Sequence, residues 1–199
     1  MMPFLEAIES SGFAVWLRET ESPFGPYPFA LALHAVSLAF LVGPNVAIDL
    51  RILGVAPRLP LASMEGFFRL MWLGFWVSAL SGLVLLPTQA IHFLTDSIFY
   101  IKLGAIALAV VILLVIHREL FRKSRATLDA TLLSTKAKTL AVASLACWAA
   151  AIMAGRLMAY EPYIRWATLR ASLIVTVMLL AVAVAARRLG RSRSLRQGV

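Results

Sequence analysis

The sequence predicts an all-α integral membrane bundle of five transmembrane helices, and three observations lead to this fold class. First, hydrophobic residues make up 61% of the 199-residue chain, charged residues make up 15%, and the mean hydropathy is +0.85. Soluble domains are closer to half apolar and a quarter charged. Second, five apolar runs approach the ~20 residues that cross a hydrocarbon core of roughly 30 Å. Third, none of these runs alternates as a barrel strand does, which leaves helices as the structure that satisfies the backbone in lipid.

The five expected spans follow one another with short connections, over residues 27–48, 66–87, 99–117, 139–159 and 167–186. Such connections leave little room for an extramembrane domain, so residues 1–199 are expected to form a single transmembrane domain. Before the first span, the apolar positions of residues 3–18 fit a short amphipathic helix in the membrane interface, with a solvated linker as the alternative. After the last span, residues 187–199 form a basic tail.

Positive charge is distributed unequally between the two sides that these spans define. The side of the N-terminus and of the loops after the second and fourth spans holds five Lys and Arg residues, and the opposite side holds the other fourteen. Because cytoplasmic loops carry the excess of Lys and Arg, we expect the N-terminus outside and the C-terminus inside. The net charge of +9 then reflects anchoring at anionic lipid headgroups, and not nucleic-acid binding.

A histidine interrupts the first span, in the stretch FALALHAVSLAFLVG. At 1.5 Å of rise per residue, His34 lies about 10 Å below the outer edge of the membrane. The simplest expectation is a hydrogen bond from this imidazole to the neighbouring helix, through Ser78, Ser81 or a backbone carbonyl. A functional role is the alternative, since ionisable groups inside a membrane are candidates for cofactor, proton or substrate sites. The same outer layer is expected to receive His92, Lys102, Met153, Arg156 and Met158.

Two cofactors fit these side chains. A b-type haem would take His34 as an axial ligand, with His92 or a methionine opposite, while Lys102 and Arg156 would bind the propionates. Copper is the second possibility, because imidazole and thioether groups suit it; its ligands would be His34, His92, Met153 and Met158.

Two features belong to the inner side of the membrane. His117 lies about 18 residues into the third span, some 27 Å from the outer edge, so we do not expect it to share a metal centre with His34. Asp49, at the end of the first span, is expected to form an ion pair with Arg69 at the start of the second.

Four segments carry a resemblance to known proteins: LHAVSLAFLVGPNVAIDLRILG, RLMWLGFWVSALSGLVLL, FYIKLGAIALAVVILLVIHREL and AGRLMAY. On these segments the chain resembles an uncharacterised five-helix family of small bacterial inner-membrane proteins, and more distantly the copper-resistance D family and small b-type haem membrane proteins. His34 and the third span that ends in His117 are also similar to the haem-binding protoporphyrinogen oxidase of bacteria, whose second histidine in the first span this sequence lacks. The resemblance implies a redox or copper-related role in the bacterial inner (cytoplasmic) membrane, with the N-terminus periplasmic.

The leading hypothesis is a membrane electron-transfer protein, or a subunit of a redox complex, that binds b-type haem near the periplasmic side. Its partners would be the lipid bilayer and other membrane redox subunits or a quinone, in a monomer or an oligomer. Copper transport or handling is the second hypothesis, and a cofactor-free structural membrane subunit is the third. The sequence shows no nucleophile triad, phosphate loop or carboxylate pair, so we do not expect an enzyme that works on its own.

Overall fold

Helices make up every element that the structure describes. The structure is a computed structural model in which residues 2–20, 22, 25–55, 57–121 and 134–160 are described, together with 164–167, 169–171, 173, 174, 177 and 178. Within these parts, four helical segments are long and apolar enough to cross a membrane. They are α3 (Pro26–Ile52), the segment Phe67–Thr95 that begins with α4 (Phe67–Leu85), α6 (Ser97–Phe121) and α8 (Thr135–Leu157).

The first four predicted spans each coincide with one of these segments, and their ends differ by a few residues. The helix α3 accommodates Pro44 in its interior and continues to Ile52. The second span ends differently, because α4 passes into a 3-10 turn, η2 (Leu86–Gln89), and then into α5 (Ala90–Thr95). Pro87 lies at the start of that turn, where a missing N–H costs no hydrogen bond.

The C-terminal predictions fall largely on residues that the structure does not describe. Residues 179–186 of the predicted fifth span (167–186) lie outside the described residues, and so does the whole basic tail, residues 187–199. The residues that are described between 164 and 178 are helical. The chain divides after Gly155 into two compact units, Met1–Gly155 and Arg156–Val199, and the four-helix bundle belongs to the first unit except for the last two residues of α8.

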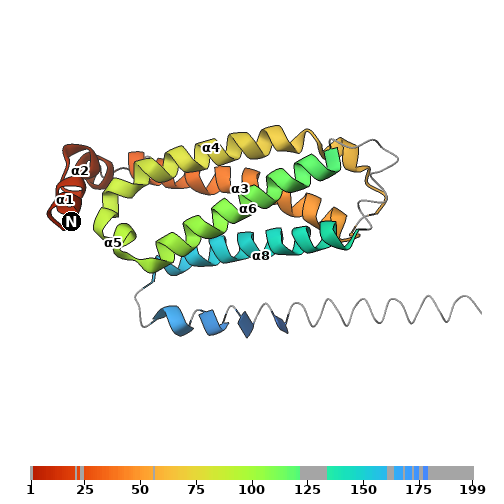
Figure 1. Ribbon diagram of the computed structural model, residues 1–199. Helices are drawn as coiled ribbons and strands as arrows, with labels where there is room; N and C mark the ends of the chain where they lie inside the picture. The colour runs from red at the N-terminus through yellow and green to blue at the C-terminus, as the bar shows by residue number, and fades with distance from the viewer. Residues whose placement is uncertain are drawn as a thin grey trace, which may run out of the picture. The chain divides into compact units, whose positions relative to one another are not determined.

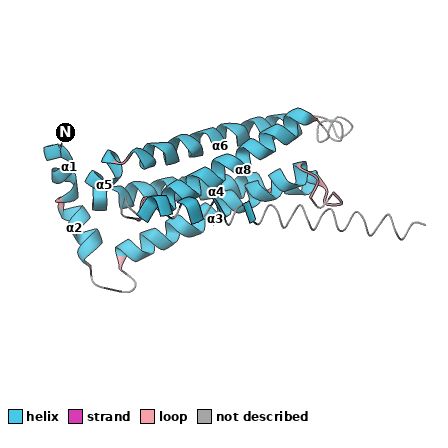
Figure 2. Ribbon diagram, turned by 90° about the horizontal axis from the view of Figure 1, so that it is seen from below, coloured by secondary structure: helices cyan, strands magenta, loops and turns pink. Residues whose placement is uncertain are grey.

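In the first unit, α3, α4, α6 and α8 lie side by side (Figures 1 and 2). The short helices α1, α2 and α5 lie at one end of this bundle, and the loop with η1 (Leu61–Met64) lies at the other (Figure 1). Only 17–33% of the most apolar stretch of each span is buried inside the protein, so most of each span needs an apolar solvent. The large side chains that face outward include Leu33, Phe40, Leu80, Leu83 and Val111.

The helices α3 and α4 approach each other closely because α4 carries small residues at a spacing of four: Gly74, Ser78 and Gly82. A Cβ atom on Gly74 would lie 2.7 Å from the carbonyl oxygen of Ser37 and 2.9 Å from the backbone nitrogen of Leu41. Small residues at such a spacing are the usual means by which membrane helices bring their backbones together.

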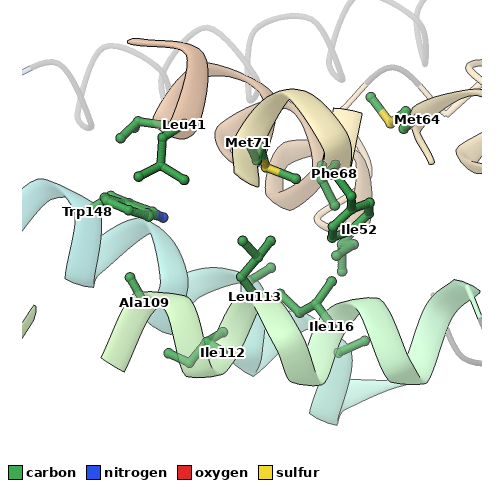
Figure 3. Close-up of a cluster of buried hydrophobic side chains, with 14 residues drawn as sticks. Leu41, Ile52, Met64, Phe68, Met71, Ala109, Ile112, Leu113, Ile116 and Trp148 are labelled. Atoms are coloured by element: carbon green, nitrogen blue, oxygen red, sulfur yellow. The ribbon is translucent and has the colours of Figure 1, made fainter. Parts of the chain in front are cut away.

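The hydrophobic core lies toward the end of the bundle that carries η1, and all four long helices contribute to it (Figure 3). The opposite end, by contrast, has small and polar residues on the inner face of α4, where Ser78 and Ser81 are buried. The buried cluster consists of Leu41, Val42, Ile48, Ile52, Met64, Phe68, Met71, Ala109, Ile112, Leu113, Ile116, Ala137, Ala141 and Trp148.

The N-terminal segment forms two helices, α1 (Met2–Glu9) and α2 (Gly12–Glu19), in place of the single helix predicted over residues 3–18. The break occurs at Ser10 and Ser11, because the hydroxyl oxygen of Ser11 accepts a hydrogen bond from Ala14 N at 3.3 Å and caps a new helix.

Both short helices pack against the end of the bundle. The side chains of Leu5 and Leu17 are buried. Arg18 Nη1 donates to the carbonyl oxygen of Thr88 at 3.2 Å, and the backbone N–H of Ile91 donates to Glu9 Oε2 at 3.2 Å. The position of this segment in the membrane interface stays a prediction.

Candidate functional site

His34 lies on the inner face of α3, half-buried against α4. Its Nδ1 atom is 2.9 Å from the carbonyl oxygen of Ser78 and 3.1 Å from the Oγ atom of Ser81. Because a carbonyl oxygen can only accept, Nδ1 carries the ring proton and donates it to Ser78. In the neutral ring, Nε2 then holds the free lone pair. The predicted hydrogen bond to the neighbouring helix is therefore present, and it also fixes which nitrogen remains available as a ligand.

The small residues of α4 define the position of the ring. A Cβ atom on Gly82 would lie 3.2 Å from Cε1 and 3.5 Å from Nδ1 of His34, so the imidazole packs directly on the glycine. Ser81 Oγ donates to the carbonyl oxygen of Val77 at 2.7 Å, which turns an oxygen lone pair toward the ring. Any larger residue at position 82 would displace the imidazole.

Lys102 lies on the inner face of α6 and is half-buried. Its side chain runs along Gly155 of α8, where a Cβ atom would lie 3.6 Å from Cε and 3.8 Å from Nζ. Its ammonium group is close enough to His34 to act on the imidazole electrostatically. Lys102 forms no ion pair with any carboxylate that the structure describes. Of the predicted site residues, His34 and Lys102 thus lie within electrostatic range of each other.

The other two histidines lie elsewhere. The ring of His117 contacts the ring of Phe68, in the first turn of α4, with centroids 4.3 Å apart and ring planes tilted by 50°. Ser78, the partner of His34, lies ten residues further along the same helix, about 15 Å away. His117 and His34 therefore lie far apart along the bundle, as their depths in the sequence predicted. His92 is exposed on α5 and contacts the ring of Phe93; among the described residues it makes no hydrogen bond or ring contact with His34. Its role as second ligand stays a prediction.

Met153 lies half-buried on α8, two residues before Gly155. Two residues turn an α-helix by roughly 200°, so Met153 leaves α8 on the face opposite to Gly155, away from Lys102. Arg156 and Met158 belong to the second unit of the chain. There, the guanidinium of Arg156 lies 5.2 Å from the ring centroid of Tyr160, a cation–π contact. The predicted parts of Arg156 and Met158 in the site around His34 stay predictions.

The structure also contains a buried polar cluster that the sequence interpretation missed. The ion pair predicted between Asp49 and Arg69 is not formed. The carboxyl group of Asp49 lies inside the bundle, where Asn45 Nδ2 donates to its Oδ2 at 3.1 Å. Asn45 Nδ2 also lies 2.9 Å from Ser144 Oγ on α8. The prediction of this ion pair was wrong because Asp49 lies on the inner face of α3. The spacing of Ser37, Leu41, Asn45 and Asp49 by four residues could have placed it there.

No family model, curated protein or solved structure matches the chain. The four apolar helices make it a multi-pass α-helical membrane protein, with a histidine held between two of its spans.

Proposed function

We propose that the protein binds one b-type haem through Nε2 of His34 and transfers electrons in the membrane, on its own or as a subunit of a redox complex. The orientation of the imidazole is the observation that supports this most directly. Nδ1 donates to the carbonyl oxygen of Ser78, which leaves Nε2 as the coordinating atom. Metal-binding histidines almost always donate their second ring N–H to a carbonyl, a carboxylate or water in this way.

The set of available donors favours haem over a metal held by side chains alone. Haem brings four nitrogen donors of its own and needs one or two axial ligands from the protein. No group of three or more His, Cys, Asp or Glu that could hold a metal ion occurs in the described parts of the chain. A copper site at His34 would have to recruit thioethers, and the candidate within the first unit, Met153, leaves α8 on the face opposite to Gly155.

Lys102 supports the same proposal through its charge. An ammonium group inside a membrane is costly unless it pairs with an anion or reaches the headgroups. A haem propionate supplies such an anion, and Lys102, whose charge acts on His34, is the proposed partner of one propionate. Arg156 is the proposed partner of the second propionate.

When bound, the haem would take up and release one electron, at a potential set by its axial ligands and by the polarity around it. The protein's own residues orient the ligand: Ser78 and Ser81 fix the imidazole, and Gly82 leaves room for it. Other membrane redox subunits or a quinone are the proposed electron partners.

The chain contains three histidines, so three single variants test every possible histidine ligand. The protein would be purified in detergent after expression with a haem supply, and its visible spectrum recorded. We expect a Soret band that is lost in His34→Ala and kept in His117→Ala. His92→Ala would convert a low-spin into a high-spin spectrum if His92 is the second ligand. A colourless wild-type protein that holds stoichiometric copper would instead support copper handling, and a colourless protein without metal would support the structural role.

We further propose that the His34 end of the bundle faces the periplasm of a bacterial inner membrane. In the first unit, the opposite end carries most of the positive charge, which is typical of the cytoplasmic side. Reporter fusions between α5 and α6, at one end of the bundle, and in the η1 loop, at the other end, would test this orientation. The described cations near the η1 end are Arg51, Arg58, Arg69, Arg118, Lys136 and Lys138, against Arg18 and Lys102 toward the other end.

A further inference from the structure

The polar cluster in the core connects two facing helix stripes. Asn45 and Asp49 are four residues apart on α3, and Ser144 and Trp148 are four residues apart on α8, so each pair shares one face of its helix. The hydrogen bond between Asn45 Nδ2 and Ser144 Oγ, at 2.9 Å, joins the two faces. All four side chains are at most 1% exposed. They form a polar group completely enclosed by the hydrophobic core.

Three atoms of this group have no hydrogen-bond partner among the residues that the structure describes: Asn45 Oδ1, Asp49 Oδ1 and Trp148 Nε1. Figure 3 shows the indole nitrogen of Trp148 on the side of the ring that points into the interior of the bundle. Unpartnered polar atoms in a core are costly, so the two free oxygens of the hydrogen-bonded pair Asn45 and Asp49 indicate a function or a bound ligand.

The carboxyl group of Asp49 also lacks a counter-charge. Its partners among the described residues are Asn45 and Ser144, and both are neutral. The charged or titratable groups nearest along α3, α4, α6 and α8 are Arg51, Arg69, His117, Cys147 and Lys138, and none of them is a partner of this carboxyl. An ionised carboxylate without a paired cation is very unfavourable in a medium of low dielectric constant. The neutral acid is the form that this environment favours.

The same atoms argue against a metal cation as the bound ligand. Hard cations take about six oxygen ligands. Here, Asp49 Oδ2 and Ser144 Oγ already accept from Asn45 Nδ2, so the free side-chain oxygens are Asn45 Oδ1 and Asp49 Oδ1. A proton needs no such coordination shell.

We propose that Asn45, Asp49 and Ser144 form a proton-binding site inside the membrane, in which Asp49 takes up and releases one proton. On release, the carboxyl O–H bond breaks and the proton passes to a water molecule at the η1 end of the bundle. The carboxylate that remains is stabilised by the Asn45 amide and the Ser144 hydroxyl. Asp49 lies three residues before the end of α3, about 4.5 Å of rise from that end. This function does not depend on the haem proposed at His34, which lies 15 residues and about 22 Å away along α3.

The chain contains three aspartates, Asp49, Asp96 and Asp129, so isotope labelling can resolve the one in the core. Protein with ¹³C-labelled aspartate carboxyl groups would be placed in lipid nanodiscs, and the infrared carbonyl band of the protonated acid followed from pH 5 to pH 10. We expect one aspartate that is still protonated at pH 7. Its band should be missing in Asp49→Asn and present in the matched control Asp96→Asn.

Ser144→Ala provides a second test that leaves the titrating group in place. The variant removes a hydrogen bond to the charged form, so we expect the band to persist to a pH about one unit higher. Three aspartates that are all ionised at pH 7 in the wild-type protein would overturn the proposal. So would loss of the band when NaCl replaces KCl at constant pH, since that result would show a sodium site.

Discussion

Substitution of Gly74 by alanine should separate α3 from α4. The new Cβ atom would lie 2.7 Å from the carbonyl oxygen of Ser37 and 2.9 Å from the nitrogen of Leu41, and ordinary van der Waals contact begins at 3.4 Å. Both neighbours are backbone atoms, so no side-chain rotation can relieve the clash and the helices themselves must move apart. Overpacking of this kind costs about 1–3 kcal/mol. The displaced interface would lose further dispersion energy along its length.

Gly104 provides a matched control, because it lies inside α6 and a Cβ atom there would meet no atom within 4 Å. Gly104→Ala should leave stability unchanged or raise it by up to about 1 kcal/mol, through the higher helix propensity of alanine. Thermal unfolding of both variants in the same detergent would give the comparison. We expect Gly74→Ala to melt below the wild type and Gly104→Ala to melt at or above it. Equal melting temperatures for the two variants would contradict the close packing of α3 on α4.

Three further predictions concern single contacts. Arg18→Ala should weaken the attachment of α2 by about 1 kcal/mol, because it removes the hydrogen bond to Thr88 O, and limited proteolysis before α3 should become faster. Lys136→Ala should change stability by less than about 0.5 kcal/mol, since the Lys136–Glu119 pair is 3.5 Å long and the lysine side chain is 70% exposed; thermal unfolding measures this directly. Ser81→Ala should retain haem binding within a few-fold in a haem titration, because Nδ1 of His34 keeps its bond to the Ser78 carbonyl oxygen; a complete loss would show that the hydroxyl is the essential partner.

The transmembrane architecture could be predicted from the sequence because length and hydropathy alone determine which segments can cross a membrane. The ends of the spans were less accurate, because hydropathy does not show how a helix accommodates a proline. In the structure, Pro44 lies within a continuous helix and Pro87 starts a 3-10 turn. The N-terminal segment was predicted as one helix because its apolar pattern hides the capping role of Ser11.

The candidate site was predictable in part. Depth along the helices placed His34 and Lys102 in one layer, and the structure brings them together. Depth alone cannot give the direction in which a side chain leaves its helix, so it could not show that Met153 and Gly155 lie on opposite faces of α8. Asp49 was assigned to the membrane edge because a charged residue near a helix end usually lies there. Only its helical spacing with Asn45, four residues before, would have placed it in the core.

The most direct test of the central claim is chemical rescue of the proposed ligand. His34→Gly removes the imidazole and leaves space beside Gly82, where free imidazole can enter. We predict that the purified variant lacks the Soret band of the wild-type protein, and that added imidazole together with haem restores it. A wild-type protein that binds no haem, or a variant whose spectrum equals that of the wild type without imidazole, would contradict the assignment of His34 as the haem ligand.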